Sequence, residues 1–216
     1  QKGFLAKARN LLTSRYYLLR TFFSPSLLPS EDFSSMIHYF IPDLEIRQTR
    51  IPFRAVATDL ITGRKIVFSE GSLRTAVLAS CAVPGAVEPV RQGQWLLADG
   101  GVTSLVPVHA TREAGADVVI AVTVDRELPP PEMETAQGIF YRAGEITAST
   151  LEDEELRDAD VVIRPKVGDI HWMDYSRAGD LIGKGEEAAR EALGAIRSSL
   201  SLYRRIVKFA SRFLPG

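Results

Sequence analysis

The spacing of hydrophobic residues changes several times along the chain, and each change predicts a different element. Apolar residues at three- and four-residue steps predict helices, whereas short alternating or continuous apolar runs predict strands. Helices are expected over residues 4–23, 30–40, 73–83, 107–114, 135–157 and 181–213, the last with a break near 198–199. Strands are expected over 51–60, 64–68, 95–98, 117–124 and 160–165. This mixture predicts an α/β protein.

Several of these elements carry their own boundary signals. Thr62 and Gly63 should turn the strand 51–60 back into the strand 64–68 as a hairpin. Ser72 is placed to cap the next helix, and Gly115 to end the helix 107–114. The succession of strand, short helix and strand between residues 95 and 124 is typical of a βαβ unit, so the sheet is expected to be mainly parallel and flanked by helices.

The stretch WLLADGGVTSLVPV, residues 95–108, has an acid at the end of an apolar run. Asp99 follows the run directly, and Gly100 and Gly101 follow Asp99. The two glycines can adopt positive φ and can let another backbone or a ligand approach closely. A carboxylate at a strand tip is then a candidate for chemistry, and the alternative is that Asp99 merely bonds the amides of its own turn.

Length and composition favour one folded domain over residues 1–216. A chain of 216 residues with 45% hydrophobic residues can bury a substantial core. The single cysteine, Cys81, excludes an internal disulfide and should be a small buried hydrophobe. The three histidines, at positions 38, 109 and 171, lack metal-ligand spacing, and no nucleotide-binding glycine loop follows a strand, so neither a metal nor a cofactor is expected.

Charge is distributed unevenly although the net charge is only −1. Residues 1–30 and the residues after Glu191 each carry five cations and no acid, which leaves 16 cations and all 27 acids in the body. The acidic body argues against nucleic-acid binding. Residues 196–214 predict a basic amphipathic helix that either contacts an anionic membrane or packs on its own domain.

Two kinds of sequence signal are missing. No apolar run reaches the roughly 18 residues of a spanning helix, and no signal peptide is visible, so we expect a bacterial-type soluble domain that is cytoplasmic or peripheral to a membrane. No serine has the G-x-S-x-G context of a nucleophile elbow; Ser69 precedes Gly71 but follows Val67.

Three segments together resemble the patatin-like phospholipases. They are AVATDLITG at 55–63, ASCAVPGAVEPV at 79–90, and LLADGGVTSLVPV followed by GADVVIAVTVD at 96–125. The resemblance is close over about 50–125 and weak over 181–193. It implies a three-layer architecture that is incomplete here on its N-terminal side, because the family's glycine-rich oxyanion loop and serine elbow are not in this chain.

The resemblance also implies a serine acyl hydrolase with a Ser–Asp dyad, in which Asp99 is the catalytic base. Gly100 and Gly101 would let its loop pack closely, and Asp59, Ser80 and Pro84 are candidates for lining the site. The substrate would be a lipid or fatty-acyl ester, and the serine would lie on a G-x-S-x-G segment outside this chain. The chain would then be the C-terminal part of a longer protein, one half of a split protein, or a pseudoenzyme.

Two other functions remain open from the sequence. One is a non-catalytic, membrane-associated or protein-binding module that retains the fold. The other is a small-molecule-binding α/β domain.

Overall fold

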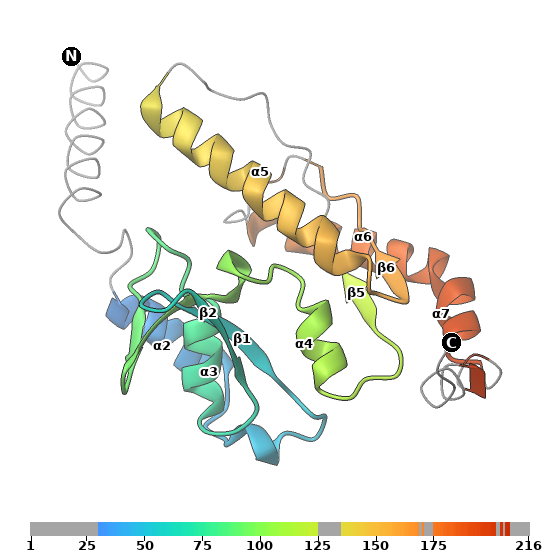
Figure 1. Cartoon of the computed structure of the whole chain (residues 1–216), viewed down its shortest axis with the longest axis horizontal. Coiled ribbons are helices and arrows are strands. Elements are labelled where there is room, and N and C mark those ends of the chain that lie inside the picture. The colour runs from blue at the N-terminus through green and yellow to red at the C-terminus, as the bar shows by residue number, and fades with distance from the viewer. Residues whose placement is uncertain are drawn as a thin grey trace. The chain divides into compact units, whose positions relative to one another are not determined.

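The computed structural model describes residues 30–124, 135–168, 170, 175–201, 204, 206 and 207. Its contacts divide into two compact units, one reaching to Ser104 and the other beginning at Leu105. The elements of both units are labelled in Figure 1. The assignment of residues 1–216 to a single domain stays a prediction.

The first unit is built on a four-stranded antiparallel sheet of order β2-β1-β4-β3. Its strands are β1 (Ala55–Asp59), β2 (Arg64–Phe68), β3 (Val90–Gln92) and β4 (Trp95–Asp99). The predicted hairpin is confirmed: Asp59 pairs with Arg64, and Gly63 in the connecting turn has φ +70°. Strand β4 lies on the other side of β1, where Ala57 pairs with Asp99.

The larger described sheet is antiparallel, whereas the βαβ pattern predicted a mainly parallel one. Two of its three strand pairs are hairpins, with loops of four and two residues between the paired strands. Such short connections can join only antiparallel strands, because a parallel crossover needs a dozen or more residues. The strand that follows β4 in sequence, β5, belongs to a separate sheet, so the predicted βαβ pairing is wrong for the described strands.

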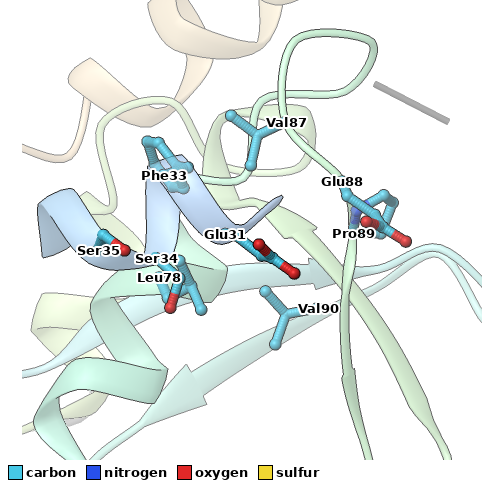
Figure 2. A pocket seen from close by; sticks show the side chains of 9 residues that line it. All are labelled: Glu31, Phe33, Ser34, Ser35, Leu78, Val87, Glu88, Pro89 and Val90. Carbon is cyan, nitrogen blue, oxygen red and sulfur yellow. The ribbon is translucent and has the colours of Figure 1, made fainter. Parts of the chain in front are cut away.

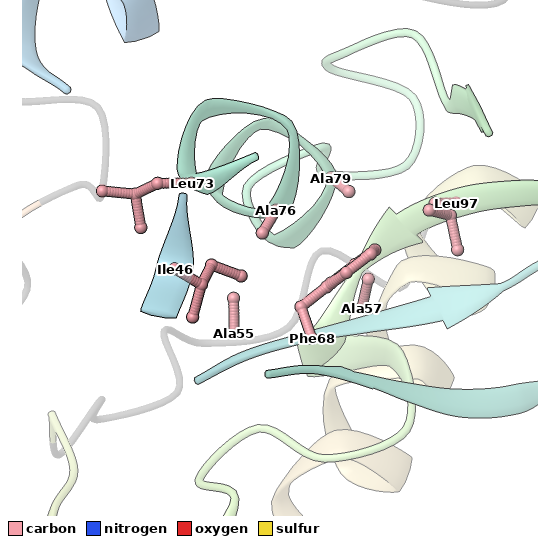
Figure 3. Close-up of a cluster of buried hydrophobic side chains, with 8 residues drawn as sticks. All are labelled: Ile46, Ala55, Ala57, Phe68, Leu73, Ala76, Ala79 and Leu97. Carbon is pink, nitrogen blue, oxygen red and sulfur yellow. The ribbon is translucent and has the colours of Figure 1, made fainter. Parts of the chain in front are cut away.

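Helix α3 (Leu73–Ser80) covers one face of this sheet and contacts β1 and β4. Ser72 caps it as predicted, since its hydroxyl accepts a hydrogen bond from the Thr75 N–H at 3.3 Å. Figure 3 shows Ala76 and Ala79 of α3 above Ala57 and Phe68 of the sheet. Small residues on the helix let it approach the strands closely, and the resulting core also includes Ile46, Ala55, Leu73 and Leu97.

One further helix and two 3-10 turns belong to the described part of the first unit. Helix α2 (Ser30–Phe40), at the predicted position, packs against α3. Between α2 and β1, η1 (Ile46–Gln48) contributes Ile46, only 2% exposed, to the core. After β4 the chain forms the 3-10 turn η2 (Gly100–Val102), which contacts β1.

The second unit contains a two-stranded parallel sheet with helices around it. Strands β5 (Ile120–Val122) and β6 (Val161–Ile163) pair in parallel, and the 21-residue helix α5 (Ala136–Leu156) lies between them in the chain. Helix α4 (Val108–Glu113) contacts α5, and Gly115 after it has φ +95°, as a helix-ending glycine should. Val108, Val119, Ala121 and Leu156 form the core cluster of this unit.

The C-terminal helical region divides earlier than the pattern predicted. Turn η3 (Tyr175–Arg177) leads into α6 (Ala178–Glu191), and α7 (Leu193–Ser199) begins two residues after α6 ends. The predicted helix over 4–23 lies outside the described residues, as does most of the predicted 196–214 helix. The mixed α/β class is confirmed.

Candidate functional site

Asp99 is the last residue of β4, and its carboxylate is partly anchored by the turn that follows. The Oδ1 atom accepts a hydrogen bond of 2.6 Å from the Gly101 N–H, so Asp99 is also the N-cap of η2. No hydrogen bond to Oδ2 is found among the described residues. One oxygen is therefore fixed by the backbone, while the other is available to a group from outside.

Gly100 explains how the turn fits against the sheet. A Cβ at this position would lie 2.3 Å from the backbone oxygen of Val56, which is closer than real atoms approach. The expected close backbone approach is thus confirmed at Gly100. Gly100 and Gly101 do not use the positive φ that glycine permits, because both lie in the 3-10 turn η2.

Two of the sequence motifs meet at Asp99. Its backbone N–H donates to the carbonyl of Ala82 at 2.9 Å, which joins the 79–90 segment to the end of β4. On the opposite side of the turn, the hydroxyls of Thr58 and Thr103 lie 2.9 Å apart and tie η2 to β1. Pairing with β1 and the bond to Ala82 therefore hold the Asp99 backbone, and the threonine pair holds the turn that follows it.

The surroundings of Asp99 disfavour its charged form. Burial raises the pKa of this carboxyl, and the hydrogen bond from Gly101 opposes the rise without cancelling it. The Cys81 side chain is exposed, contrary to the buried position expected, because it follows the last residue of α3. Desolvation of the thiol by its neighbours, together with the negative charge of Asp99, nevertheless raises the pKa of Cys81. An elevated carboxyl pKa is a property that a general base can use.

Asp59 has a different environment although it is only 1% exposed. Its Oδ1 accepts from the N–H groups of Ile61 at 3.2 Å and Leu96 at 3.1 Å, and its Oδ2 accepts from the Thr62 hydroxyl at 2.6 Å. The Thr62 bond is the main reason that the pKa of Asp59 is lowered, and burial opposes it. Asp59 thus holds the β1–β2 turn against β4, and its proposed place in the lining of a site stays a prediction.

Ser80 and Pro84 lie on the segment that meets Asp99. Ser80 is the last residue of α3, two positions before Ala82, and is partly buried. Pro84 is exposed and precedes Gly85, whose φ is +82°. Their place in the lining of a site stays a prediction, and no described bond joins either side chain to Asp99.

A separate pocket of about 480 Å³ opens between α2, α3 and the start of β3. Figure 2 shows Glu31 projecting from α2 among apolar side chains that include Leu78 and Val90. Glu88 adds a second carboxylate, and none of the described residues that line the pocket is basic. Asp99 is not one of its lining residues, so this hollow and the strand-end carboxylate are distinct features of the first unit.

The second unit holds the most polar cluster outside these two places. His109 on α4 lies 2.8 Å from Asp158, measured from Nε2 to Oδ2, and 3.8 Å from Glu155. Arg112, one turn later, binds the carboxylate of Asp160 and the backbone oxygen of Asp117. These contacts join α4 to the end of α5. Within the described ranges, no group of His, Cys, Asp and Glu side chains could hold a metal ion.

One part of the site was missed in the sequence. Strand β3 was not predicted, although Gly93 and Gln94 are a usable hairpin signal: Gln92 pairs with Trp95, and Gly93 has φ +59° at the first loop position, where a type II′ turn requires glycine. This hairpin fixes β4 on its second edge and so helps to position Asp99.

Fold and site together define a mixed α/β protein with a candidate carboxylate base at the end of a strand. A family model for the patatin-like phospholipases matches residues 2–112, just over half of the chain. The chain belongs to this family.

Relatives of several lengths share part of this sequence. An uncharacterised NTE family protein of Mycobacterium tuberculosis is 30% identical over 168 residues, covering 66% of this chain and 29% of that protein. A second one from the same species is 35% identical over 99 residues, covering 46% and 28%. Patatin-like phospholipase domain-containing protein 7 of Mus musculus is 33% identical over 102 residues, covering 46% and 8%. The aligned part thus spans less than a third of each relative.

None of the described helices is both long and apolar enough to cross a bilayer.

Proposed function

We propose that this chain supplies the aspartate of a serine lipid acyl hydrolase that uses a Ser–Asp dyad. The observation that carries the proposal is the geometry of Asp99, with one carboxylate oxygen held by Gly101 and the other without a described protein partner. The serine belongs to a G-x-S-x-G segment outside this chain, called here the serine-bearing segment. Membership of the patatin-like phospholipase family supports the general class of reaction.

The reaction would proceed in two halves. The Asp99 Oδ2 atom accepts the proton of the serine hydroxyl while the serine oxygen attacks the ester carbonyl carbon. The tetrahedral intermediate collapses, the alcohol leaves with the proton returned by Asp99, and the acyl group stays on the serine. Water, deprotonated by Asp99, then attacks the acyl-enzyme, and the fatty acid is released as the proton passes back to the serine.

The environment of Asp99 supports this role energetically. Burial makes the charged carboxylate less stable than it would be in water, so the group gains more by accepting a proton. The bond from Gly101 keeps the group oriented during the transfer. Capping η2 and acting as a base are compatible, because they use different oxygens.

The substrate is proposed to be a lipid or fatty-acyl ester, as the names of the family and of the mouse relative suggest. We further propose that the complete domain has the mainly parallel, three-layer architecture expected from the sequence, with the serine-bearing segment included in its sheet. Peripheral contact with an anionic membrane, through the basic residues after Glu191, is part of the same proposal.

The test is Asp99→Asn in the protein that also contains the serine-bearing segment. The variant keeps the size of the side chain and an oxygen for the Gly101 N–H, but it removes the base. Hydrolysis of short-chain fatty esters is expected to fall by roughly 100-fold or more, in the range that loss of a general base usually causes. Asp153→Asn, an exposed acid on α5, is the matched control and should retain full activity.

The alternative is a non-catalytic module in which Asp99 only caps its turn. It predicts that Asp99→Asn has the same ester-hydrolysis rate as the parent protein. That result, or the absence of any hydrolysis by the parent protein, would overturn the proposed function.

A further inference from the structure

The pocket between α2, α3 and the start of β3 is a candidate binding site of its own. Its volume of about 480 Å³ lies within the usual range for pockets that hold small organic molecules. All of its described lining residues belong to the first unit, and Asp99 is not among them. A ligand in this pocket would therefore not depend on the chemistry proposed for Asp99.

One part of the pocket is an apolar wall. Its largest side chains come from α2, α3 and the start of β3, and they are Phe33, Leu78, Val87 and Val90. Val87 is only 4% exposed, and Val90 packs against the core cluster of the first unit. The wall is thus continuous with the core, and it offers a hydrocarbon body a surface on which each buried CH2 group would tighten binding by roughly threefold.

The other part of the pocket is negatively charged. Glu31 and Glu88 both line it, and no ion pair to either carboxylate is found among the described residues. In Figure 2 the Glu31 side chain projects from α2 towards the segment that carries Glu88 and Val90. Ser34 and Ser35 add two hydroxyl oxygens from α2. Since none of the described lining residues is basic, the charge of the pocket favours a cation.

The kind of cation follows from the groups that line the pocket. A primary ammonium group has three N–H donors, and carboxylate and hydroxyl oxygens accept hydrogen bonds from such donors. A quaternary ammonium group has no N–H and is typically held by several aromatic faces. Phe33 is the one aromatic side chain among the described lining residues, so the pocket suits the primary group better.

We propose that this pocket binds a small amphipathic primary amine. The ammonium group lies on the carboxylates of Glu31 and Glu88, and the hydrocarbon body lies on the apolar wall. The wall supplies most of the affinity, whereas the carboxylates select for charge. Because both glutamates are exposed, their attraction for the ammonium group is partly screened by water and salt. Binding should accordingly weaken as ionic strength rises.

Titration of the 216-residue chain with 4-phenylbutylamine, followed by NMR of the backbone amides, tests the proposal. We expect a dissociation constant of about 1 mM or lower, with the largest shifts in α2 and residues 87–90. The uncharged 4-phenylbutanol and the quaternary 4-phenylbutyltrimethylammonium ion should each bind roughly tenfold more weakly. The shorter probe 2-phenylethylamine, which lacks two CH2 groups, should also bind roughly tenfold more weakly. Equal affinity for the alcohol or the quaternary ion, or the largest shifts outside the pocket, would overturn the proposal.

Matched variants separate the two carboxylates from a general effect of charge. Glu31→Gln and Glu88→Gln keep the size of exposed side chains, and each should weaken amine binding by roughly threefold, the double variant by roughly tenfold. Binding of the alcohol should not change. Asp32→Asn, next to Glu31 but outside the pocket lining, removes the same charge and should alter the affinity by less than about twofold. Undiminished amine binding by the double variant would contradict the site.

A different occupant of the same chemistry is distinguished by one further protein. Residues 1–29 carry five cations and no acid, so this segment is itself complementary to the pocket in charge. Amine binding by a protein that lacks residues 1–29, but not by the full chain, would overturn the proposal in favour of that segment. Equal affinity of the two proteins would support the small amine. None of these measurements uses ester hydrolysis, so their failure and that of the proposed function are separate outcomes.

Discussion

Replacing Gly100 by alanine tests the packing that places Asp99. The added Cβ would lie 2.3 Å from the backbone oxygen of Val56 and 2.8 Å from its carbonyl carbon. Because carbon and oxygen normally approach no closer than about 3.3 Å, η2 and β1 would have to separate by about 1 Å. Neither partner is the end of a flexible side chain, so the strain must be taken up by the backbone of a central strand.

The expected cost is at the upper end of the range for overpacking, about 3 kcal/mol. Gly144→Ala is the matched control, because Gly144 lies in α5 and a Cβ added there would have no atom within 4 Å. The same chemical change there should stabilise the protein by about 0.5–1 kcal/mol, through the better helix propensity of alanine. The two alanine variants should therefore differ by about 4 kcal/mol.

Urea denaturation followed by circular dichroism measures this difference. With a typical slope of about 2 kcal/mol per molar urea, Gly100→Ala should lower the midpoint by about 1.5 M. In the protein that also contains the serine-bearing segment, a displacement of the Asp99 turn by about 1 Å should also reduce ester hydrolysis by about 100-fold. A Gly100→Ala chain with the midpoint of the parent would refute the close approach of η2 to β1.

The remaining predictions concern charge. Burial raises the folded pKa of Asp99, so the favourable contribution of this carboxyl to the free energy of unfolding is lost as pH rises through that pKa. Asp99→Asn should therefore be no less stable than the parent at pH 7, as measured by the urea midpoints. The pKa of Asp59 is lowered, so its effect on stability has the opposite pH dependence. Its contribution to the free energy of unfolding is present above about pH 4 and is lost as pH falls through the folded pKa. Asp59→Asn should therefore be destabilising at pH 7 and nearly neutral in acid, again by urea midpoints. Deletion after Ala195 should weaken sedimentation with anionic vesicles, most strongly at low salt; unchanged sedimentation would refute the membrane contact.

Local chemistry made several elements predictable from the sequence. Ser72 caps α3, Gly63 closes the first hairpin and Gly115 ends α4, each because the residue type suits the backbone that the element needs there. Asp99 could be singled out because an acid after an apolar run must lie at the end of a buried strand. The resemblance between three separate segments then identified the family, which the comparisons establish.

Other features could not be read from local patterns. Glycine permits positive φ, but neither Gly100 nor Gly101 adopts it. Glycine is also used where space is short, as at Gly100, and only the neighbouring strand reveals which need applies. Strand β3 was missed because three residues are too few for a periodic signal. The four-stranded sheet of the described residues is antiparallel, because a βαβ pattern in sequence does not determine which strands pair.

The sequence by itself determined the class of the protein and its family, and it singled out Asp99 as the candidate base. These depend on residue types and their order, which are visible without coordinates. The tertiary structure decided what surrounds that residue: the Ala82 carbonyl on its backbone, the Gly101 N–H on one oxygen and the burial that raises its pKa. It also decided which side chains of β5 are buried, such as Ala121, and which are exposed, such as Val122. Such properties arise between segments far apart in the chain, so they exist only once the strands have paired and the helices have packed.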